Sequence, residues 1–244
     1  MSARDHAARQ RYLNLLTGCL TRELFLDEDD VEPAVRAEGR DWPRTAETMV
    51  GGARLANVRH AVETVLEENV PGDPIETGVW RGGVTILMRG ILEAWGDTER
   101  SVWVADSFEG LPAPNVEDYP DDEGHDLSGV ETLMVGADIV RANFERYDLL
   151  DDRVRFLEGW FADTLAGAPI EQLAVLRLDG DLYESTMDAL VPLYDKVAPG
   201  GFVIVDDYGA WEPCRKAVHD FRDRHGITDE IVEVDWTGVY WRKS

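Results

Sequence analysis

Residues 174–208 hold two short apolar runs, each ending at acidic side chains, with a helical pattern between them. Two strands joined by a helix form a parallel βαβ crossover, in which both strands end at the same edge of the sheet. Open α/β sheets bind their ligands at that edge. The sequence therefore predicts a doubly wound α/β fold in which four acids share one rim. They are Asp179 and Asp181 after the run 174–178, and Asp206 and Asp207 after the run 202–205.

Three of these acids would suit a hard divalent cation. Mg²⁺ prefers oxygen ligands in octahedral geometry and keeps several positions for water or substrate oxygens. Asp179, Asp206 and Asp207 would supply the protein's share of such a shell. Each acid could equally form a turn or cap the next helix, because Asp is common in both places. Taken together, the two strand ends favour a metal site over separate turns.

The length and composition fit one α/β domain with an N-terminal extension. The chain has 244 residues, of which 44% are hydrophobic, so it can bury a sizeable core. We expect residues 1–52 to form a helical extension and a lid. Residues 53–244 would then form the domain that binds the ligands.

The chain is strongly acidic, with 49 Asp and Glu against 24 Lys and Arg and a formal charge of −25. This charge repels phosphate backbones and anionic lipids, so neither nucleic acid nor a membrane is an expected partner. It attracts cations such as Mg²⁺ or a sulfonium cofactor, although solubility alone explains most of it. There is no membrane-spanning apolar stretch or secretory signal, and the two cysteines lack redox spacing. These features predict a cytoplasmic protein.

The sequence of the N-terminal region predicts one helix followed by one irregular segment. Apolar residues recur at helical spacing from about residue 8 to 25, and this stripe would cover the domain or contact another subunit. An acidic stretch follows from Asp27. Residues 40–52, with Pro43 and a Gly-Gly pair, indicate a loop or lid. The stripe consists of Tyr12, Leu15, Leu16, Cys19 and Leu20.

Strands and helices alternate through the rest of the chain. Five parallel strands followed by an antiparallel hairpin would make a seven-stranded, mostly parallel sheet. This order fits the Rossmann-like class I methyltransferase fold better than a dinucleotide dehydrogenase. The expected strands end near Thr77 or span residues 102–105, 154–157, 174–178 and 202–205, with hairpin strands at 230–234 and 239–242. The expected helices span residues 53–68, 82–95, 130–146, 185–196 and 215–224.

A glycine-rich turn after the first strand predicts a cofactor site. Glycines let the backbone approach a ligand, and the next helix offers free N–H groups, although such turns are also common as purely structural features. The turn lacks the G-x-G-x-x-G pattern of NAD-binding proteins. At the end of the second strand, a carboxylate could bind a ribose or cap the strand. The residues expected here are Glu76, Thr77, Gly78, Gly82, Gly83, Asp106 and Ser107.

The third strand is followed by Gly159, Trp160 and Phe161, against which an adenine ring could pack. The two aromatic residues could equally belong to the core or to an interface. Arg81 could bind the carboxylate of an amino-acid tail bidentately, or pair with one of the many acids. With the ribose site, these residues indicate a nucleoside cofactor.

Five segments carry the strongest family signal. They are IETGVWRGG, VWVADSFEGLP, LLDDRVRFLEGWFADTL, LAVLRLDGDLYESTMDAL and PGGFVIVDDY. These segments closely resemble the macrocin O-methyltransferase family, whose members include enzymes that methylate deoxysugars of macrolide and aminocoumarin antibiotics. The resemblance runs from about Arg40 to the C-terminus and is weakest in the loop 112–129. Because loops above the rim select the acceptor, that loop bears on substrate identity.

The resemblance implies an enzyme that uses S-adenosylmethionine and Mg²⁺ and acts on a hydroxyl of a sugar attached to a natural product. It also implies a homo-oligomer. By the same resemblance, Asp179, Asp206 and Asp207 are the expected metal ligands, and Asp179 is also the expected base. The implied cofactor contacts are the turn 76–83, Asp106 with Ser107, and Trp160.

The expected reaction transfers a methyl group to a sugar hydroxyl held beside the metal. Binding of two vicinal hydroxyl oxygens to Mg²⁺ would lower the pKa of the attacking one, and Asp179 could then take its proton. His125 is a rival base if its acidic loop folds over the acceptor, although a lone loop histidine is more often solvated. Tyr208, Trp42 and Met49 are further candidate acceptor contacts.

Three other functions remain open at this point. A catechol O-methyltransferase would use vicinal phenolic oxygens to chelate Mg²⁺ in the same way. An NAD-dependent nucleotide-sugar oxidoreductase could use the same sheet edge, but the glycine pattern speaks against it. A cofactor-binding protein without activity would have no need for a costly buried cluster of like charges.

Overall fold

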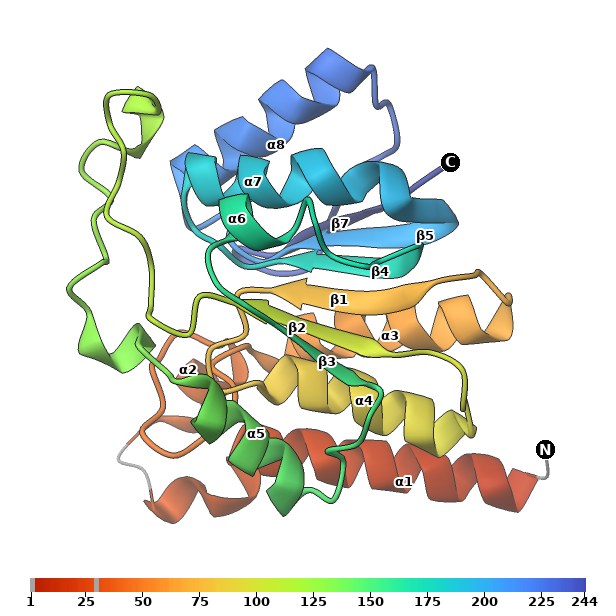
Figure 1. Cartoon of the computed structure of the whole chain (residues 1–244). Coiled ribbons are helices and arrows are strands. Elements are labelled where there is room, and N and C mark those ends of the chain that lie inside the picture. The colour runs from red at the N-terminus through yellow and green to blue at the C-terminus, as the bar shows by residue number, and fades with distance from the viewer. Residues whose placement is uncertain (1–2, 29–30) are drawn as a thin grey trace.

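A computed structural model of the chain describes residues 3–28 and 31–244 and contains one seven-stranded sheet (Figure 1). The strand order is β3-β2-β1-β4-β5-β7-β6, with β1 to β5 parallel and β6 and β7 antiparallel. The predicted sheet is confirmed. Its strands are β1 (Asp73–Thr77), β2 (Val102–Asp106), β3 (Val154–Glu158), β4 (Leu173–Leu178), β5 (Val197–Val205), β6 (Val232–Glu233) and β7 (Val239–Arg242).

Helices cover both faces of the sheet (Figure 1). On one face lie α1 (Ala3–Leu20), α3 (Gly52–Glu67), α4 (Gly83–Trp95) and α5 (Ala137–Arg146). The other face carries α6 (Phe161–Thr164), α7 (Tyr183–Leu193) and α8 (Glu212–His225). Because β4 is buried on both faces, its sequence is apolar throughout except at Arg177. Shorter helical turns are η1 (Glu23–Glu28), α2 (Pro33–Ala37), η2 (Pro120–Asp122), η3 (Glu131–Leu133) and η4 (Tyr194–Lys196).

The N-terminal helix differs from its prediction at both ends and in its buried face. It ends at Leu20 because Arg22 adopts a left-handed φ of 60°, which interrupts helical geometry. The buried stripe is Leu13, Leu16 and Leu20, whereas the predicted stripe members Tyr12 and Leu15 are 38% and 58% exposed. This face packs against α4, so it covers the domain. Residues 29–30 of the acidic stretch lie outside the described ranges.

The helix predicted over residues 130–146 is also too long. Gly136 has extended backbone angles and caps the N-terminus of α5, so the helix starts at Ala137. The residues before it form only the short turn η3. Residues 107–136 are therefore mostly irregular and reach past the rim of the sheet (Figure 1).

The parallel strands end level with one another, which places the loops that follow them on one rim. The N–H of Asp179 donates to Thr77 O at 2.9 Å, and the N–H of Asp206 donates to Leu178 O at 2.9 Å. The strand order reverses between β1 and β4, the position at which such sheets bind ligands. Residues 40–51 are irregular, as predicted. Across the described ranges, no helix combines the length and apolar character needed to cross a bilayer.

Candidate functional site

A cavity of about 670 Å³ opens at this rim. Its volume lies within the roughly 300–1,000 Å³ typical of small-molecule sites. One side is formed by residues 39–50, called here the N-terminal wall, and another by the loop 107–136, called the acceptor loop. The floor is formed by the turns after β1 and β2 and by the acids after β4 and β5. The cavity therefore spans both halves of the predicted site.

Three carboxylates at the ends of β4 and β5 converge in this cavity. One oxygen from each of Asp179, Asp206 and Asp207 lies within 4.8 Å of the other two. Asp206 and Asp207 are buried, and the side chain of Asp179 is 28% exposed. Three oxygens at this spacing match the partial shell that Mg²⁺ takes from a protein. The structure thus brings the three predicted metal ligands together.

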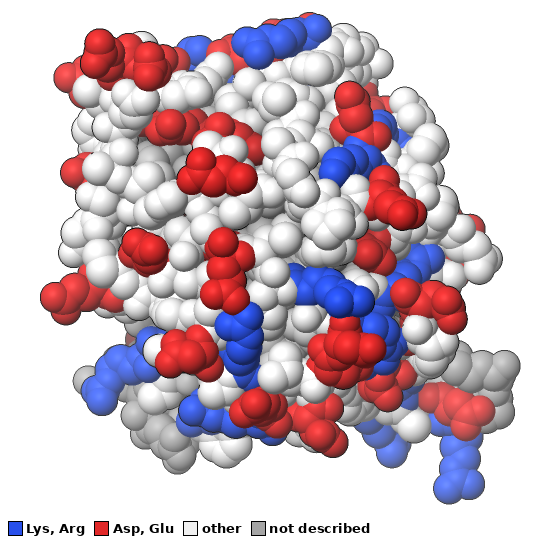
Figure 2. Space-filling view, viewed as in Figure 1, with Lys and Arg blue, Asp and Glu red and all other residues white. Residues whose placement is uncertain are grey.

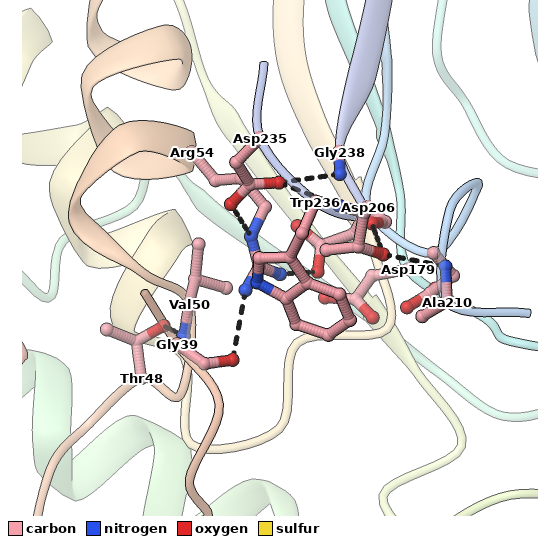
Figure 3. Close-up of polar contacts among 12 residues, drawn as sticks. Gly39, Thr48, Val50, Arg54, Asp179, Asp206, Ala210, Asp235, Trp236 and Gly238 are labelled. Atoms are coloured by element: carbon pink, nitrogen blue, oxygen red, sulfur yellow. Dashed lines mark hydrogen bonds and ion pairs between the residues drawn. The ribbon is translucent and has the colours of Figure 1, made fainter. Parts of the chain in front are cut away.

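Two buried arginines face these acids. Arg177 on β4 donates from Nη1 to Asp179 Oδ2 at 2.8 Å and forms ion pairs with Glu76 and Asp206. Figure 3 shows Arg54 of α3 reaching the second oxygen of Asp206. Buried charges are costly when unpaired, and each arginine offsets part of this cost. The two guanidinium groups hold Asp179 and Asp206 in place.

The pKa values show how the charge is shared. Burial would raise the pKa of Asp206, but Arg177 and Arg54 outweigh it and lower this pKa. Burial, and then the charge of Asp181, raise the pKa of Asp207 well above its ordinary value. Burial, followed by the charge of Asp206, also raises the pKa of Asp179. The acids outnumber the arginines, so a divalent cation would relieve the remaining repulsion. The donor set fits Mg²⁺.

Asp181 is a further acid that lines the cavity. Its φ of 56° is left-handed, which is uncommon outside glycine and costs free energy. Its N–H donates to Asp207 Oδ2 at 3.2 Å. Burial and the charge of Asp179 raise the pKa of Asp181 to about 8. The sequence indicates that Asp181 lies on this rim, but only the structure shows that it belongs to the cavity.

The two halves of the site touch through their backbones at Gly78. This residue has a φ of 87°, and a Cβ atom placed on it would lie 1.7 Å from Asp179 O. No side chain fits there, so the turn after β1 requires glycine. The predicted cofactor turn and the predicted metal loop therefore pack directly against each other.

The predicted cofactor residues of the first two strands divide into two groups. Glu76, Gly78, Asp106 and Ser107 line the cavity, whereas Thr77, Gly82 and Gly83 lie behind its surface. Asp106 accepts hydrogen bonds from Val79 N and Phe108 N, both at 2.7 Å, and so ties the turn after β1 to the turn after β2. Burial raises the pKa of Asp106. Ser107 Oγ also donates to Asp106 Oδ1 at 3.5 Å, so the predicted ribose contact of Asp106 stays a prediction.

Gly83 and Arg81 hold the N-terminal wall. Gly83 N donates to Glu47 O at 2.9 Å, and a Cβ atom at position 83 would lie 2.6 Å from that oxygen. Arg81 Nη1 donates to Pro43 O at 3.0 Å and to Ala46 O at 2.9 Å. Arg81 is not part of the cavity lining, so its predicted contact with a cofactor carboxylate gains no support from this arrangement.

Trp160 and Phe161 line the cavity after β3, and Trp160 is 37% exposed. Gly159, just before them, has a φ of 136° and donates to Asp106 O at 2.9 Å. Both aromatic residues border the cavity, and the Phe161 ring lies beside Gly180, which follows β4. Their assignment as an adenine wall stays a prediction.

The predicted acceptor contacts also divide into two groups. Trp42 and Met49 line the cavity from the N-terminal wall. His125 lies outside the lining, with its ring 5.6 Å from that of Trp211, which does line the cavity. Tyr208 also lies outside, and its hydroxyl is 2.7 Å from His219 Nε2. The first pair can meet a ligand directly, whereas the second pair supports neighbouring elements.

The visible molecular surface is mixed in charge. On the face shown in Figure 2, acidic side chains lie across the whole surface, whereas most Lys and Arg lie in its lower half. This face carries no continuous basic area. The expectation that nucleic acid is not a partner stays a prediction.

The sequence reasoning missed Arg177, Arg54 and Trp236. A charge inside the apolar run 173–178 is a signal that identifies Arg177. Arg54 and Trp236 come from opposite ends of the domain, so no local pattern could pair them. Trp236 Nε1 donates to Glu38 O at 2.9 Å, which connects the hairpin turn to the start of the N-terminal wall.

The chain was compared with known proteins. The family model described as Macrocin-O-methyltransferase (TylF) matches residues 6–243, earlier in the chain than the resemblance from Arg40 indicated. The 8-demethyl-8-(2,3-dimethoxy-alpha-L-rhamnosyl)-tetracenomycin-C 4'-O-methyltransferase of Streptomyces olivaceus is 56% identical, over 97% of this chain and 94% of that protein. The Mycinamicin III 3''-O-methyltransferase of Micromonospora griseorubida is 51% identical, over 94% and 89%.

A solved structure of the O-methyltransferase NovP superposes with a TM-score of 0.94 at 51% sequence identity, covering 97% of this chain and 99% of that one. The chain is an O-methyltransferase and belongs to the macrocin O-methyltransferase family.

Proposed function

We propose that this enzyme transfers the methyl group of S-adenosylmethionine to a hydroxyl of a deoxysugar on a glycosylated natural product, with Mg²⁺ held by Asp179, Asp206 and Asp207. The observation that carries the proposal is the convergence of these three carboxylates in a cavity that also reaches the turn at Gly78. The names of the relatives support a glycoside acceptor, since one of them acts on a rhamnosyl-bearing tetracenomycin.

When bound, Mg²⁺ supplies positive charge next to the acceptor hydroxyl and S-adenosylmethionine supplies the methyl group. The chain's own residues bind and orient. Asp106 fixes the two turns that would hold the cofactor, and Arg177 fixes Asp179. Trp42 and Trp160 both line the cavity and would help to exclude water when ligands fill it. Positioning of the two substrates is then the main source of acceleration.

Asp179 is the predicted base, and the structure adds Asp181 as a second candidate. Oδ2 of Asp179 already accepts a hydrogen bond from Arg177. Asp181 lines the same cavity and has no arginine partner among the described residues. If Asp181 takes the proton, Asp181→Asn lowers kcat and leaves the dependence on Mg²⁺ unchanged. If Asp179 takes it, only replacement of Asp179 removes both turnover and the metal requirement.

The direct test incubates the enzyme with labelled S-adenosylmethionine, Mg²⁺ and a panel of glycosylated natural products that each lack one sugar methyl group. We expect turnover of at least one glycoside, loss of turnover in EDTA and recovery on adding Mg²⁺. Asp179→Ala should abolish transfer and still bind S-adenosylhomocysteine. Asp223→Ala, which changes an exposed acid on α8, is the matched control and should stay active.

Two results would overturn the proposal. Turnover of catechols with none of the glycosides would assign the acceptor to the phenolic class. Full activity after exhaustive EDTA treatment would remove the metal from the mechanism. A homo-oligomer and a cytoplasmic location stay predictions, which gel filtration of the purified enzyme and imaging of a tagged chain would test.

A further inference from the structure

The acceptor loop contains one fully buried carboxylate, Asp122, in the turn η2. Its Oδ1 accepts a hydrogen bond from Tyr183 N at 2.6 Å, and its Oδ2 accepts one from Glu184 N at 3.1 Å. These two N–H groups belong to the first turn of α7. Both oxygens of a side chain with 0% exposure are therefore satisfied by backbone groups 61 and 62 residues further along the chain.

The local sequence of α7 provides no cap of its own. Its N-cap residue is Leu182, and no side-chain hydrogen bond from it closes the first turn. The first N–H groups of a helix have no intrahelical partner, and the helix dipole favours an anion beside them. A buried carboxylate, in turn, is stable only when it is hydrogen-bonded. Asp122 and the start of α7 therefore satisfy each other's requirements, which docks the loop on the helix.

This contact joins two walls of the cavity. The first turn of α7 follows directly after Asp181, and Glu184 and Ser185 line the cavity. From the acceptor loop, Leu111 and Leu127 line the same cavity. Figure 1 shows the loop passing beside the N-terminal ends of α7 and α8. Asp122 itself is not part of the lining, so it sets the distance between the walls without touching a ligand.

The ends of the acceptor loop are held by other contacts on the cofactor side. Ser107 Oγ donates to Gly110 O at 2.8 Å, and Trp80 Nε1 donates to Thr132 O at 2.8 Å. Neither contact involves Asp122. The middle of the loop also meets α7 through the rings of Tyr119 and Tyr183, 6.0 Å apart, and α8 through Asp121 and Lys216. Loss of the buried Asp122 cap should therefore loosen the middle of the loop while the ends beside the predicted cofactor turns stay in place.

We propose that Asp122 is a positioning residue for the acceptor: by capping α7 from the acceptor loop, it fixes the wall against which the glycoside binds. The kinetic part of this inference rests on the proposed function. When the loop undocks from α7, a smaller fraction of the enzyme can bind the acceptor, and the apparent affinity for the acceptor falls in proportion to that fraction. The cofactor affinity does not depend on the same contact.

The test compares Asp122→Ala and Asp122→Asn with Asp121→Ala. Asp121 is the adjacent acid and is exposed, and it pairs with Lys216 of α8 at 3.3 Å. Asp121→Ala therefore removes an exposed contact of the same loop and shows how much more the buried cap contributes. Loss of a cap, at about 1–2 kcal/mol, lowers the ratio of docked to undocked loop roughly 5- to 30-fold. We expect Asp122→Ala to raise KM for the acceptor more than about twofold and up to this factor, with kcat at saturating acceptor and the Kd for S-adenosylhomocysteine within about twofold of wild type. Asp122→Asn keeps one acceptor oxygen and should show a smaller effect.

Hydrogen exchange provides a second readout that needs no turnover. In Asp122→Ala, the amides of Tyr183 and Glu184 and those of the middle of the loop should exchange faster, while amides of β2 and α4 keep their protection. Unchanged exchange at Tyr183 and Glu184 would overturn the docking role. Equal loss of acceptor and cofactor affinity, or an acceptor KM that matches that of Asp121→Ala, would overturn the positioning role. If wild type methylates no glycoside, the proposed function fails, and the exchange measurement still decides whether Asp122 docks the loop.

Discussion

Arg177 Nη1 donates to Asp179 Oδ2 at 2.8 Å, so a fully buried guanidinium fixes the carboxylate on which the proposed chemistry depends. The same guanidinium also pairs with Glu76 and Asp206. Two of the three proposed metal ligands, Asp179 and Asp206, are therefore held in position by a residue of the central strand. Strand β4 thus carries Arg177, and the proposed ligand that Arg177 orients follows directly after the strand.

Replacement of Arg177 by Met should be severely destabilising. Removing one partner of a buried ion pair leaves uncompensated charge, and such changes cost about 3–5 kcal/mol. Urea unfolding measures the loss in free energy of unfolding. Arg242→Ala is the control, because Arg242 pairs with Glu68 at an exposed site and little change is expected there. Similar losses for the two variants would contradict the role given to Arg177.

Mg²⁺ should stabilise the folded enzyme through the three acids. A ligand that binds only the folded state at about 100 times its Kd adds about 2.7 kcal/mol to the free energy of unfolding. Asp207→Asn should lose most of this gain, because it removes one of the converging oxygens. Thermal and urea unfolding with and without Mg²⁺ measure the effect. Asp223→Ala should keep the full gain, and a gain that persists in Asp207→Asn would place the ion elsewhere.

Gly78 and Gly96 allow a matched comparison of backbone requirements. Both have left-handed angles, with φ of 87° and 70°, so alanine at either position costs about 1–2 kcal/mol. At Gly96 nothing lies within 4 Å of an added Cβ, whereas at Gly78 it would meet Asp179 O. Gly78→Ala should therefore cost roughly 1–3 kcal/mol more, the range seen for overpacking. It should also reduce methyl transfer, which Gly96→Ala leaves near wild type. Equal costs would show that the turn after β1 can move away from the metal loop.

The N-terminal wall should show a pH-dependent contribution from Glu47. Tyr147 donates to Glu47 Oε2 at 3.0 Å, yet burial raises the pKa of Glu47 above its ordinary value of 4.5. The folded state thus binds this proton more tightly than the unfolded state. Its contribution is complete below pH 4.5 and is lost as the pH rises through the folded-state pKa. The stability of wild type relative to Glu47→Gln, measured by urea unfolding, should fall from pH 4 towards pH 8. A relative stability that rises with pH would contradict the assignment.

The rim of the sheet could be predicted from sequence because strand ends are local signals. Apolar runs that stop at Asp179 and Asp206, with a helix between them, have few arrangements other than a right-handed crossover. The alternation of strand and helix patterns predicted a mostly parallel sheet with a terminal hairpin, whereas the order of the strands comes from the structure. The buried face of the N-terminal helix was harder to predict, because Tyr12 and Leu15 are apolar but exposed. Only the contact with α4 selects Leu13 and Leu16 as the buried stripe.

The remaining features of the site depend on long-range contacts that leave no local pattern. Arg54 reaches Asp206 over 152 residues, and Asp122 reaches Tyr183 over 61. The sequence shows that an arginine or an acid is present but not which partner it meets. Arg81 illustrates the limit, because its position suited a cofactor contact, whereas its guanidinium binds Pro43 O and Ala46 O.

The place of β7 in the sheet has a consequence for biosynthesis. β7 lies between β5 and β6, and its Trp241 is fully buried beside Val203. While the ribosome is still making residues 206–238, β5 is an unpaired edge strand and the core behind it lacks its largest side chain. Edges of this kind recruit other chains, so the nascent enzyme is open to aggregation until β7 has emerged. Removal of residues 239–244, which include β7, should shift the product from soluble enzyme to inclusion bodies.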